Sequence, residues 1–121
     1  MIPGAIPTID VREAERRLRE DPARPVLLDV REANEFAAVR APGAALVPTS
    51  SFTARVGDLP TDRPLLVVCH LGSRSAAVTG YLLRSGFTDV VNVAGGMDAW
   101  QAAGLPVRSG PPAPGEGDLP G

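Results

Sequence analysis

The sequence predicts an α/β domain in which helices cover both faces of a mostly parallel sheet. Short apolar runs alternate along the chain with segments of helical periodicity, which is typical of successive βα units. The clearest run, Leu65–Val68, is apolar at every position, as expected of a strand that is buried on both faces. Glycine and proline stand beside several of these segments, where the chain has to turn.

The first half of the chain begins with a helix that we expect to start after Asp10. Asp10 and Glu13 have the spacing of a capping box. Val11, Ala14 and Leu18 then fall on one helical face. The following segments are, in order, a strand at Val26–Val30, a short helix at Arg31–Val39, a turn at Pro42–Gly43, a weak strand at Ala44–Val47 and a short helix at Ser50–Val56.

The second half of the chain contains the most strongly patterned elements. From its periodicity, the first helix of this half should direct Ala77, Val78 and Tyr81 inward. Gly86 suits the left-handed conformation that ends many helices, and Phe87 can pack back over that end. The expected elements are a strand at Leu65–Val68, a helix at Arg74–Ser85, a strand at Val90–Val93 and a helix at Gly96–Ala103, which Gly104 and Pro106 terminate.

The chain of 121 residues is long enough for one domain, which we place at residues 1–107. Eight of the fourteen residues of Arg108–Gly121 are glycine or proline, and Leu119 is the one strongly apolar residue among them. Such a segment buries too little surface to offset its ordering entropy. We therefore expect residues 108–121 to be a flexible tail, or a linker, and the first few residues to be loose.

Composition excludes several classes of function. The net charge of −2 and the absence of a basic excess argue against a nucleic-acid partner. All twelve basic residues are arginines, so neither Schiff-base chemistry nor a P-loop lysine is available. With one cysteine and one histidine, no zinc site can form from such ligands, and we expect no metal or organic cofactor. The sequence shows no membrane segment or signal peptide, and a lone cysteine suggests the cytoplasm.

The strongest chemical signal lies at the end of the strand Leu65–Val68. Cys69 follows this strand directly, and a helix begins about five residues later. Backbone amides of a tight turn and the positive end of the helix dipole can both point at the thiol and lower its pKa toward neutrality. Gly72 permits the tight turn, and Arg74 can brace the loop or hold an anion. The plainer alternative, a buried structural cysteine, fits this context less well.

The other residues of this candidate site have both a structural and a functional interpretation. Leu71 gives the loop mouth an apolar wall. His70 can tune the thiolate, although a side chain that points outward is the simpler expectation. Ser73 and Ser75 can offer hydroxyls to the thiolate or substrate, and Ser75 can equally cap the helix. Asp29 can accept hydrogen bonds from loop amides, pair with an arginine or cap the helix that follows it, and Arg31 is expected to form a surface pair with Glu35. Gly95 and Gly96 suit a close backbone approach or a tight turn.

Four motifs in order give the chain a specific resemblance. They are Leu28-Asp29-Val30-Arg31-Glu32 followed by Glu35-Phe36, then Pro42-Gly43-Ala44, then the loop from Cys69 to Ser75, and finally Gly95-Gly96-Met97-Asp98-Ala99-Trp100 followed by Gly104-Leu105-Pro106-Val107. Over about Ile6 to Val107 the chain resembles a single-domain rhodanese. This resemblance implies a three-layer domain with a central sheet of about five strands. Arg40 stands where relatives often have a histidine.

The resemblance also implies a function. In a rhodanese, one cysteine carries sulfane sulfur as a persulfide, and the resemblance implies that this cysteine is Cys69. The implied sulfur donor is thiosulfate or a persulfide, and the implied acceptor is cyanide or a thiol. Small molecules or a protein persulfide are the expected partners. A low-turnover sulfur carrier or binding module is the alternative. Cdc25-type phosphatases and arsenate reductases share the fold but have a Cys-x5-Arg loop, whereas Cys69 and Arg74 form Cys-x4-Arg.

Overall fold

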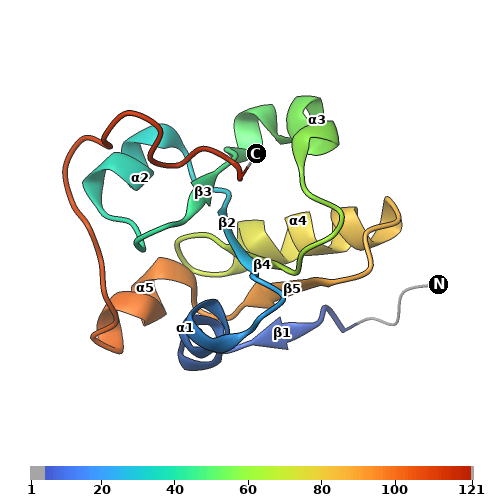
Figure 1. The fold of residues 1–121 in the computed structure, drawn as a ribbon, viewed down its shortest axis with the longest axis horizontal. Coiled ribbons are helices and arrows are strands. Elements are labelled where there is room, and N and C mark those ends of the chain that lie inside the picture. The colour runs from blue at the N-terminus through green and yellow to red at the C-terminus, as the bar shows by residue number, and fades with distance from the viewer. Residues whose placement is uncertain (1–4, 121) are drawn as a thin grey trace.

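A computed structural model describes residues 5–120 and contains one parallel sheet with helices on both faces (Figure 1). The strand order is β1-β5-β4-β2-β3, and every pairing is parallel. The strands are β1 (Thr8–Ile9), β2 (Val26–Asp29), β3 (Ala45–Leu46), β4 (Leu65–Val68) and β5 (Val90–Val93). This arrangement confirms the predicted α/β class.

The helices pack on both faces of the sheet. They are α1 (Val11–Glu20), α2 (Ala33–Ala38), α3 (Phe52–Arg55), α4 (Ser73–Arg84) and α5 (Gly96–Ala102), with short 3₁₀ turns at Thr49–Ser51 and Val56–Asp58 on either side of α3. Helices α3 and α4 lie in one core layer, and α1 and α5 lie in the other. Asp10 caps α1 as predicted, because its carboxylate accepts the N–H of Glu13 at 2.8 Å. Within residues 5–120, no helix has the length and apolar character that crossing a membrane requires.

Alternation along the strands divides the core into two layers. Leu65, Val67 and Cys69 point to the layer that contains residues of α3 and α4. Leu66 and Val68 point to the other layer, which contains residues of α1 and α5. The thiol of Cys69 therefore lies on the α4 side of the sheet, at the carboxyl end of the central strand β4.

Two features of the secondary structure differ from expectation. Strand β1 was not predicted, because it is only two residues long and carries no strand pattern, yet it pairs with β5. Ala77 was expected to face inward but is exposed, whereas Val78 and Leu82 are buried and Tyr81 is half-buried. The inward face of α4 is thus displaced by about one residue from the predicted face.

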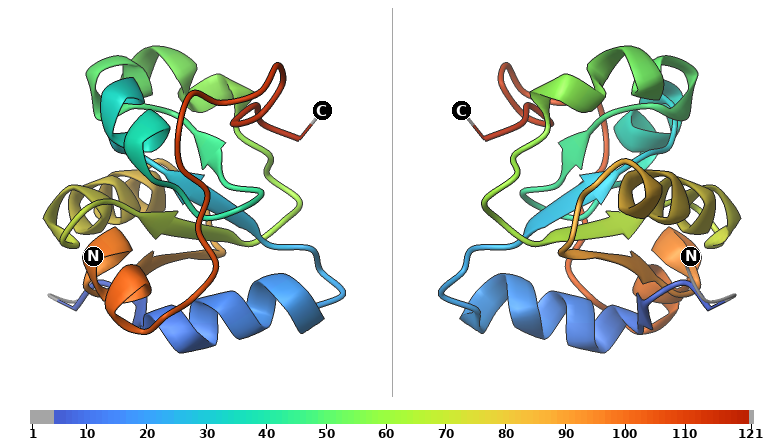
Figure 2. Two further views of the ribbon diagram at one scale, coloured as in Figure 1. Left: turned by 90° about the vertical axis from the view of Figure 1, so that its left-hand side faces the viewer. Right: turned by 90° about the vertical axis from the view of Figure 1, so that its right-hand side faces the viewer.

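The C-terminal segment also differs from the flexible tail that composition suggested. It leaves α5 and passes α2 and β3 (Figures 1 and 2). The N–H of Leu46 donates to the carbonyl of Gly117 at 2.7 Å, and Leu119 packs against the core layer that contains α3 and α4. Hydrogen bonds, together with the packing of Leu119, thus hold this segment on the domain.

Arg40 provides the central anchor of the C-terminal segment. Its side chain is 3% exposed and forms an ion pair with Glu116. Its guanidinium also donates to the carbonyl of Gly110 at 2.6 Å, and its backbone pairs with that of Arg108. A buried guanidinium requires such partners, so the segment supplies what Arg40 needs. Composition alone could not reveal this pairing.

Candidate functional site

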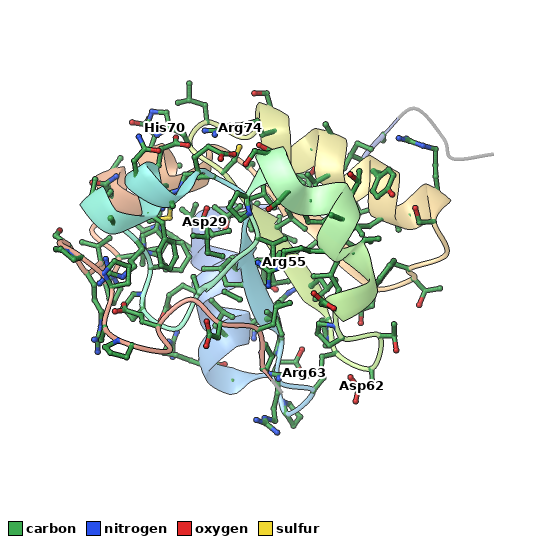
Figure 3. The ribbon with its side chains drawn as sticks, turned by 90° about the horizontal axis from the view of Figure 1, so that it is seen from above. Asp29, Arg55, Asp62, Arg63, His70 and Arg74 are labelled. Atoms are coloured by element: carbon green, nitrogen blue, oxygen red, sulfur yellow. The ribbon has the colours of Figure 1, made fainter. Side chains whose placement is uncertain are left out.

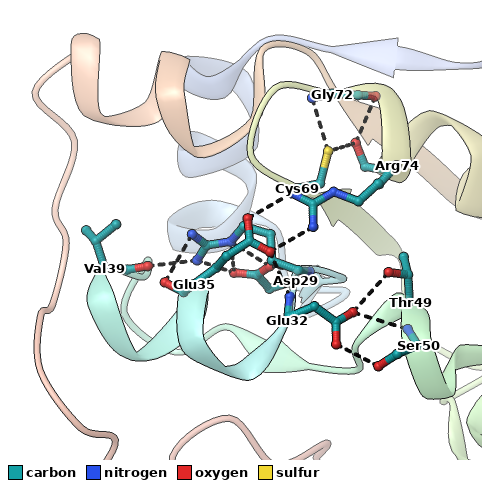
Figure 4. A network of polar contacts seen from close by, with 11 residues as sticks. Asp29, Glu32, Glu35, Val39, Thr49, Ser50, Cys69, Gly72 and Arg74 are labelled. Atoms are coloured by element: carbon teal, nitrogen blue, oxygen red, sulfur yellow. Dashed lines mark hydrogen bonds and ion pairs between the residues drawn. The ribbon is translucent and has the colours of Figure 1, made fainter.

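The loop between β4 and α4 surrounds the sulfur of Cys69 with hydrogen-bond donors (Figure 4). The N–H of Gly72 donates to Sγ at 3.0 Å, and Oγ of Ser75 lies 3.3 Å from Sγ. Gly72 has φ of +111°, a conformation that favours glycine, and this turn directs its N–H back at the sulfur. The structure thus brings Cys69, Gly72 and Ser75 together.

These contacts decide the ionisation of the thiol. Burial raises the pKa of Cys69, whose exposed fraction is 1%, but the hydrogen bonds outweigh burial. The Ser75 hydroxyl and the backbone N–H groups of Ser75, Gly72 and Leu71 lower the pKa, so the net pKa lies below its ordinary value. The loop therefore makes the thiolate, which is the nucleophilic form, more accessible than it is in an ordinary cysteine.

Arg74 braces the loop against a neighbouring helix. Its two terminal nitrogens donate to both carboxylate oxygens of Glu35 on α2, at 2.7 and 2.9 Å (Figure 4). The hydrogen bonds from Arg74 hold the pKa of Glu35 down at about 2, although burial opposes the shift. Because its planar fork is engaged by Glu35, the geometry favours the bracing role over the capture of an anion.

Asp29 and Arg31 form a buried ion pair at the end of β2. Their side chains are 0% and 2% exposed, and the terminal Nη2 of Arg31 lies 2.7 Å from the carboxylate. Arg31 also donates to the carbonyl of Val39 at 2.7 Å, which ties α2 to the sheet. Asp29 thus pairs with an arginine and also accepts the backbone N–H of Arg31 at 3.0 Å. The expected surface ion pair of Arg31 and Glu35 is wrong, because Arg31 is buried and reaches Glu35 only at its backbone carbonyl, at 3.4 Å, while the carboxylate of Glu35 binds Arg74.

The start of α5 supports the loop from the other side. The N–H groups of Met97 and Asp98 donate to the carbonyls of Cys69 and His70, at 2.7 and 3.0 Å. A Cβ on Gly96 would clash with both of those carbonyl oxygens. Gly95 and Gly96 therefore provide both the tight turn into α5 and the close backbone approach, the two interpretations that the sequence left open.

The remaining loop side chains point outward. His70 is exposed, and in Figure 3 it lies with Arg74 at one edge of the molecule while Asp29 lies nearer the centre. Leu71 is 63% exposed and Ser73 is also exposed. Among residues 5–120, neither the side chain of His70 nor that of Ser73 forms a hydrogen bond with Sγ of Cys69. In the described part of the chain, no cluster of side chains has the composition to hold a metal ion.

Two residues of this site were missed by sequence reasoning. Glu35 was assigned to Arg31 on helical spacing, and no local pattern reveals a partner 39 residues away. Asn92 lies on β5 and accepts a hydrogen bond from Ser75 at 2.6 Å. A single polar residue within an otherwise apolar strand, Val90–Val93, was the signal for Asn92.

Comparison with known proteins identifies the family of the chain. The family model of the rhodanese-like domain matches residues 10–103. The chain is 37% identical over 84 residues to a thiosulfate sulfurtransferase, GlpE, of Actinobacillus succinogenes, across 69% of this chain and 76% of that protein. It is 33% identical over 99 residues to a sulfurtransferase of Allochromatium vinosum, across 82% of this chain and 92% of that protein.

A solved structure shares the same fold. The rhodanese-related protein of Thermoplasma volcanium superposes with a TM-score of 0.77 at 27% identity, covering 84% of this chain and 97% of that one. The region that the family model matches includes the whole β4–α4 loop together with α2 and α5, which brace the loop. The chain therefore belongs to the rhodanese family and is a sulfurtransferase.

Proposed function

We propose that Cys69 is the nucleophile of this sulfurtransferase and carries the transferred sulfur as a persulfide. The main support is the convergence of donors on Sγ, with the N–H of Gly72 at 3.0 Å and the hydroxyl of Ser75 at 3.3 Å. Preorganised donors of this kind stabilise a thiolate before the reaction and the charged outer sulfur after it. The lowered pKa of Cys69 follows from the same contacts.

The reaction has two half-reactions. The Cys69 thiolate attacks the outer sulfur of thiosulfate, the S–S bond of the donor breaks, and sulfite leaves with the electron pair. A nucleophilic acceptor, cyanide or a thiol, then attacks the outer sulfur of the persulfide, and the thiolate returns. Thiosulfate is supported by the name of the relative from Actinobacillus succinogenes. Neither step calls for a metal or organic cofactor.

The burial of Cys69 limits which donors can react. With 1% of the residue exposed, Sγ meets only a narrow group that enters the loop mouth. Thiosulfate and persulfides both present a terminal sulfur that projects from the rest of the molecule. Both donor classes therefore fit the site, with the organic or protein part of a persulfide remaining outside beside Leu71.

A free thiol is required for this chemistry, and we place it in a reducing compartment such as the cytoplasm. Cys69 has no second cysteine in the chain to pair with.

Steady-state kinetics and mass spectrometry test the proposal together. With thiosulfate and cyanide, the protein should form thiocyanate and give parallel double-reciprocal plots, because the sulfur is held covalently between two half-reactions. Intact mass after thiosulfate should increase by one sulfur atom. Cys69→Ser should abolish both signals, and turnover by this variant would refute the assigned nucleophile. Ser73→Ala is a matched control, because Ser73 makes no contact with Sγ among the hydrogen bonds of residues 5–120.

A sulfur carrier that serves one protein partner is the second candidate. Leu71 is 63% exposed at the loop mouth. Beside the loop lies a hollow of about 250 Å³ lined by Thr49, Phe52, Thr53, Arg74, Ala77, Val78 and Tyr81. A partner could place an apolar side chain there while it receives sulfur. Stoichiometric loading by thiosulfate with negligible discharge to cyanide would favour this candidate over the enzyme.

A further inference from the structure

Asn92 is a buried polar residue in the core layer that contains the thiol. It lies on β5, is 7% exposed, and shares its sheet face with Val90, which packs in the same cluster as Cys69. Among residues 5–120, its one side-chain hydrogen bond is to Ser75. Ser75 is itself 0% exposed and in contact with Sγ. The three side chains thus form a chain from Asn92 through Ser75 to Cys69.

The hydroxyl of Ser75 has one proton and three acceptors around it. Oδ1 of Asn92 lies at 2.6 Å, the carbonyl oxygen of Gly72 at 3.1 Å and Sγ of Cys69 at 3.3 Å. When Cys69 is a neutral thiol, its S–H can donate to Ser75, and Ser75 can donate to Asn92. A thiolate has no proton to give, so the Ser75 hydroxyl must turn toward the sulfur to stabilise it.

A carboxamide suits this reversal because it carries both an acceptor and a donor. When the Ser75 proton turns toward Sγ, the Asn92 side chain can turn over and donate from Nδ2 to Oγ. Donation into Oγ makes the hydroxyl a stronger donor to the thiolate, because hydrogen bonds in a chain polarise one another. We propose that Asn92 is a positioning residue that directs the proton of Ser75 toward the sulfur of Cys69. The proposal rests on the function proposed for Cys69.

Charged groups also surround the loop, and they are the competing explanation for any change in ionisation. They are Arg74 at the start of α4, its partner Glu35 on α2, the pair of Asp29 and Arg31 at the end of β2, and His70 in the loop. Asn92 forms no hydrogen bond with any of them in the described residues. A neutral substitution of Asn92 therefore tests the chain through Ser75 alone.

The test is a titration of the thiol in a double-mutant cycle. The chain has one cysteine, so thiolate absorbance and the pH dependence of iodoacetamide alkylation report on Cys69 alone. Asn92→Leu, a neutral replacement of similar shape, should raise the pKa of Cys69. The thiolate fraction at neutral pH should fall roughly two- to tenfold, the equivalent of one hydrogen bond. In a Ser75→Ala background the same substitution should change nothing.

Asn92→Asp provides a second, independent test. A carboxylate can only accept hydrogen bonds, so it would keep the hydroxyl proton of Ser75 directed at residue 92 and away from the sulfur. It should reduce the thiolate fraction more than Asn92→Leu, and by more with Ser75 present than in Ser75→Ala. Equal changes in the two backgrounds, or no change from either variant, would overturn the proposal. Circular dichroism checks that each variant is folded. The titration uses no sulfur donor, so its outcome is separate from that of the Cys69→Ser assay, which tests the proposed function.

Discussion

Glu35 on α2 connects this helix to the β4–α4 loop through Arg74, which lies 39 residues later in the chain. Its two carboxylate oxygens match the two terminal nitrogens of Arg74, a geometry that a lysine cannot reproduce. The pair fixes the first turn of α4, from which Ser75 contacts the sulfur of Cys69. At the scale of single residues, Glu35 is therefore a support for the site, although it contacts no reacting atom.

Glu35→Gln should change both activity and the acid dependence of stability. The pKa of Glu35 is lowered from 4.5 to about 2 in the fold, so its contribution to the free energy of unfolding is present above pH 4.5 and is lost as the pH falls toward 2. The contribution is modest, because the side chains are 29% and 35% exposed. In the variant, the free energy of unfolding should depend less steeply on pH in this window, as measured by urea unfolding.

The same variant should lower the rate of sulfur transfer by about tenfold or more, because the loop loses its brace. Arg74→Lys should lower it as well, since a point charge cannot replace a planar fork. An unchanged pH slope together with an unchanged rate would show that the pair has no role in holding the loop.

Gly96→Ala should damage the site through the backbone. A methyl group there would clash with the carbonyl oxygens of Cys69 and His70, and φ is +57°. Gly104 provides a matched control, since φ is +72° but nothing lies within 4 Å of the added Cβ. Gly104→Ala should cost about 1–2 kcal/mol from backbone strain, measured by urea unfolding, whereas Gly96→Ala should cost clearly more and also reduce persulfide loading. Equal losses in the two variants would contradict the close contact.

At the scale of elements, the site is one βα unit supported by the starts of two other helices. Strand β4 brings Cys69 to the end of the sheet at which all the strands have their carboxyl ends. Helix α4 presents its first turn to the sulfur. The short spacing from Cys69 to Arg74 keeps Gly72 close enough to donate to Sγ at 3.0 Å. The size of this loop should therefore determine its chemistry.

Insertion of one glycine after Gly72 should separate the donors from the sulfur. Because Glu35 holds Arg74 in place, the added residue must enlarge the loop itself. The rate at which thiosulfate loads sulfur onto the protein, measured by intact mass, should fall by about 10²–10³-fold. This is the usual loss when a preorganised hydrogen-bond donor is removed. A glycine inserted after Gly86, in the exposed turn beyond α4, is the control for insertion as such. Unchanged loading in the enlarged loop would show that loop size is not the determinant.

The elements with strong local patterns could be predicted, and those that depend on distant partners could not. The observed bounds of β4 and β5 agree with the predicted strands, because both are short runs of mainly apolar residues between polar segments. The turn at Gly86 was also predicted, and φ there is +100°. Strand β1 has only two residues, so no periodicity exists to detect, and its pairing with β5 is a tertiary effect.

The same distinction holds within the site. Cys69, Gly72 and Ser75 are close in sequence, so the contacts among them could be inferred from one turn. Glu35 and Asn92 reach the loop from other elements, and single-sequence spacing carries no information on such pairs. The exposed face of α4 was misjudged for a related reason, because the neighbours that cover a helix decide which residues it buries.

At the scale of the whole molecule, the C-terminal segment completes the sheet edge. Strand β3 lies at the end of the strand order, and an edge strand presents unpaired backbone groups. The carbonyl of Gly117 accepts one of them, the N–H of Leu46. The segment also surrounds the guanidinium of Arg40 and supplies the carboxylate of Glu116 and the carbonyl of Gly110 as its partners.

Deletion of residues 109–121 should therefore destabilise the domain, although the segment has little apolar surface. The loss in the free energy of unfolding should exceed about 1 kcal/mol, the size of a typical single substitution. The main cause is that the buried charge of Arg40 loses both Glu116 and the carbonyl of Gly110. Urea unfolding of the full and shortened chains measures this loss, and an unchanged midpoint would show that the segment does not dock.

A double-mutant cycle separates the charge from the rest of the segment. In an Arg40→Leu background no guanidinium is left without partners, so the same deletion should cost clearly less than it does in the native chain. The loss in the free energy of unfolding that remains in this background should reflect the hydrogen bond of Leu46 and the packing of Leu119. Equal costs in the two backgrounds would assign the stabilisation to that backbone contact and packing, and Arg40 would then have no role as the anchor. Persulfide loading of Cys69 should survive the deletion at temperatures where the shortened chain is folded, because the segment makes none of the hydrogen bonds to the sulfur.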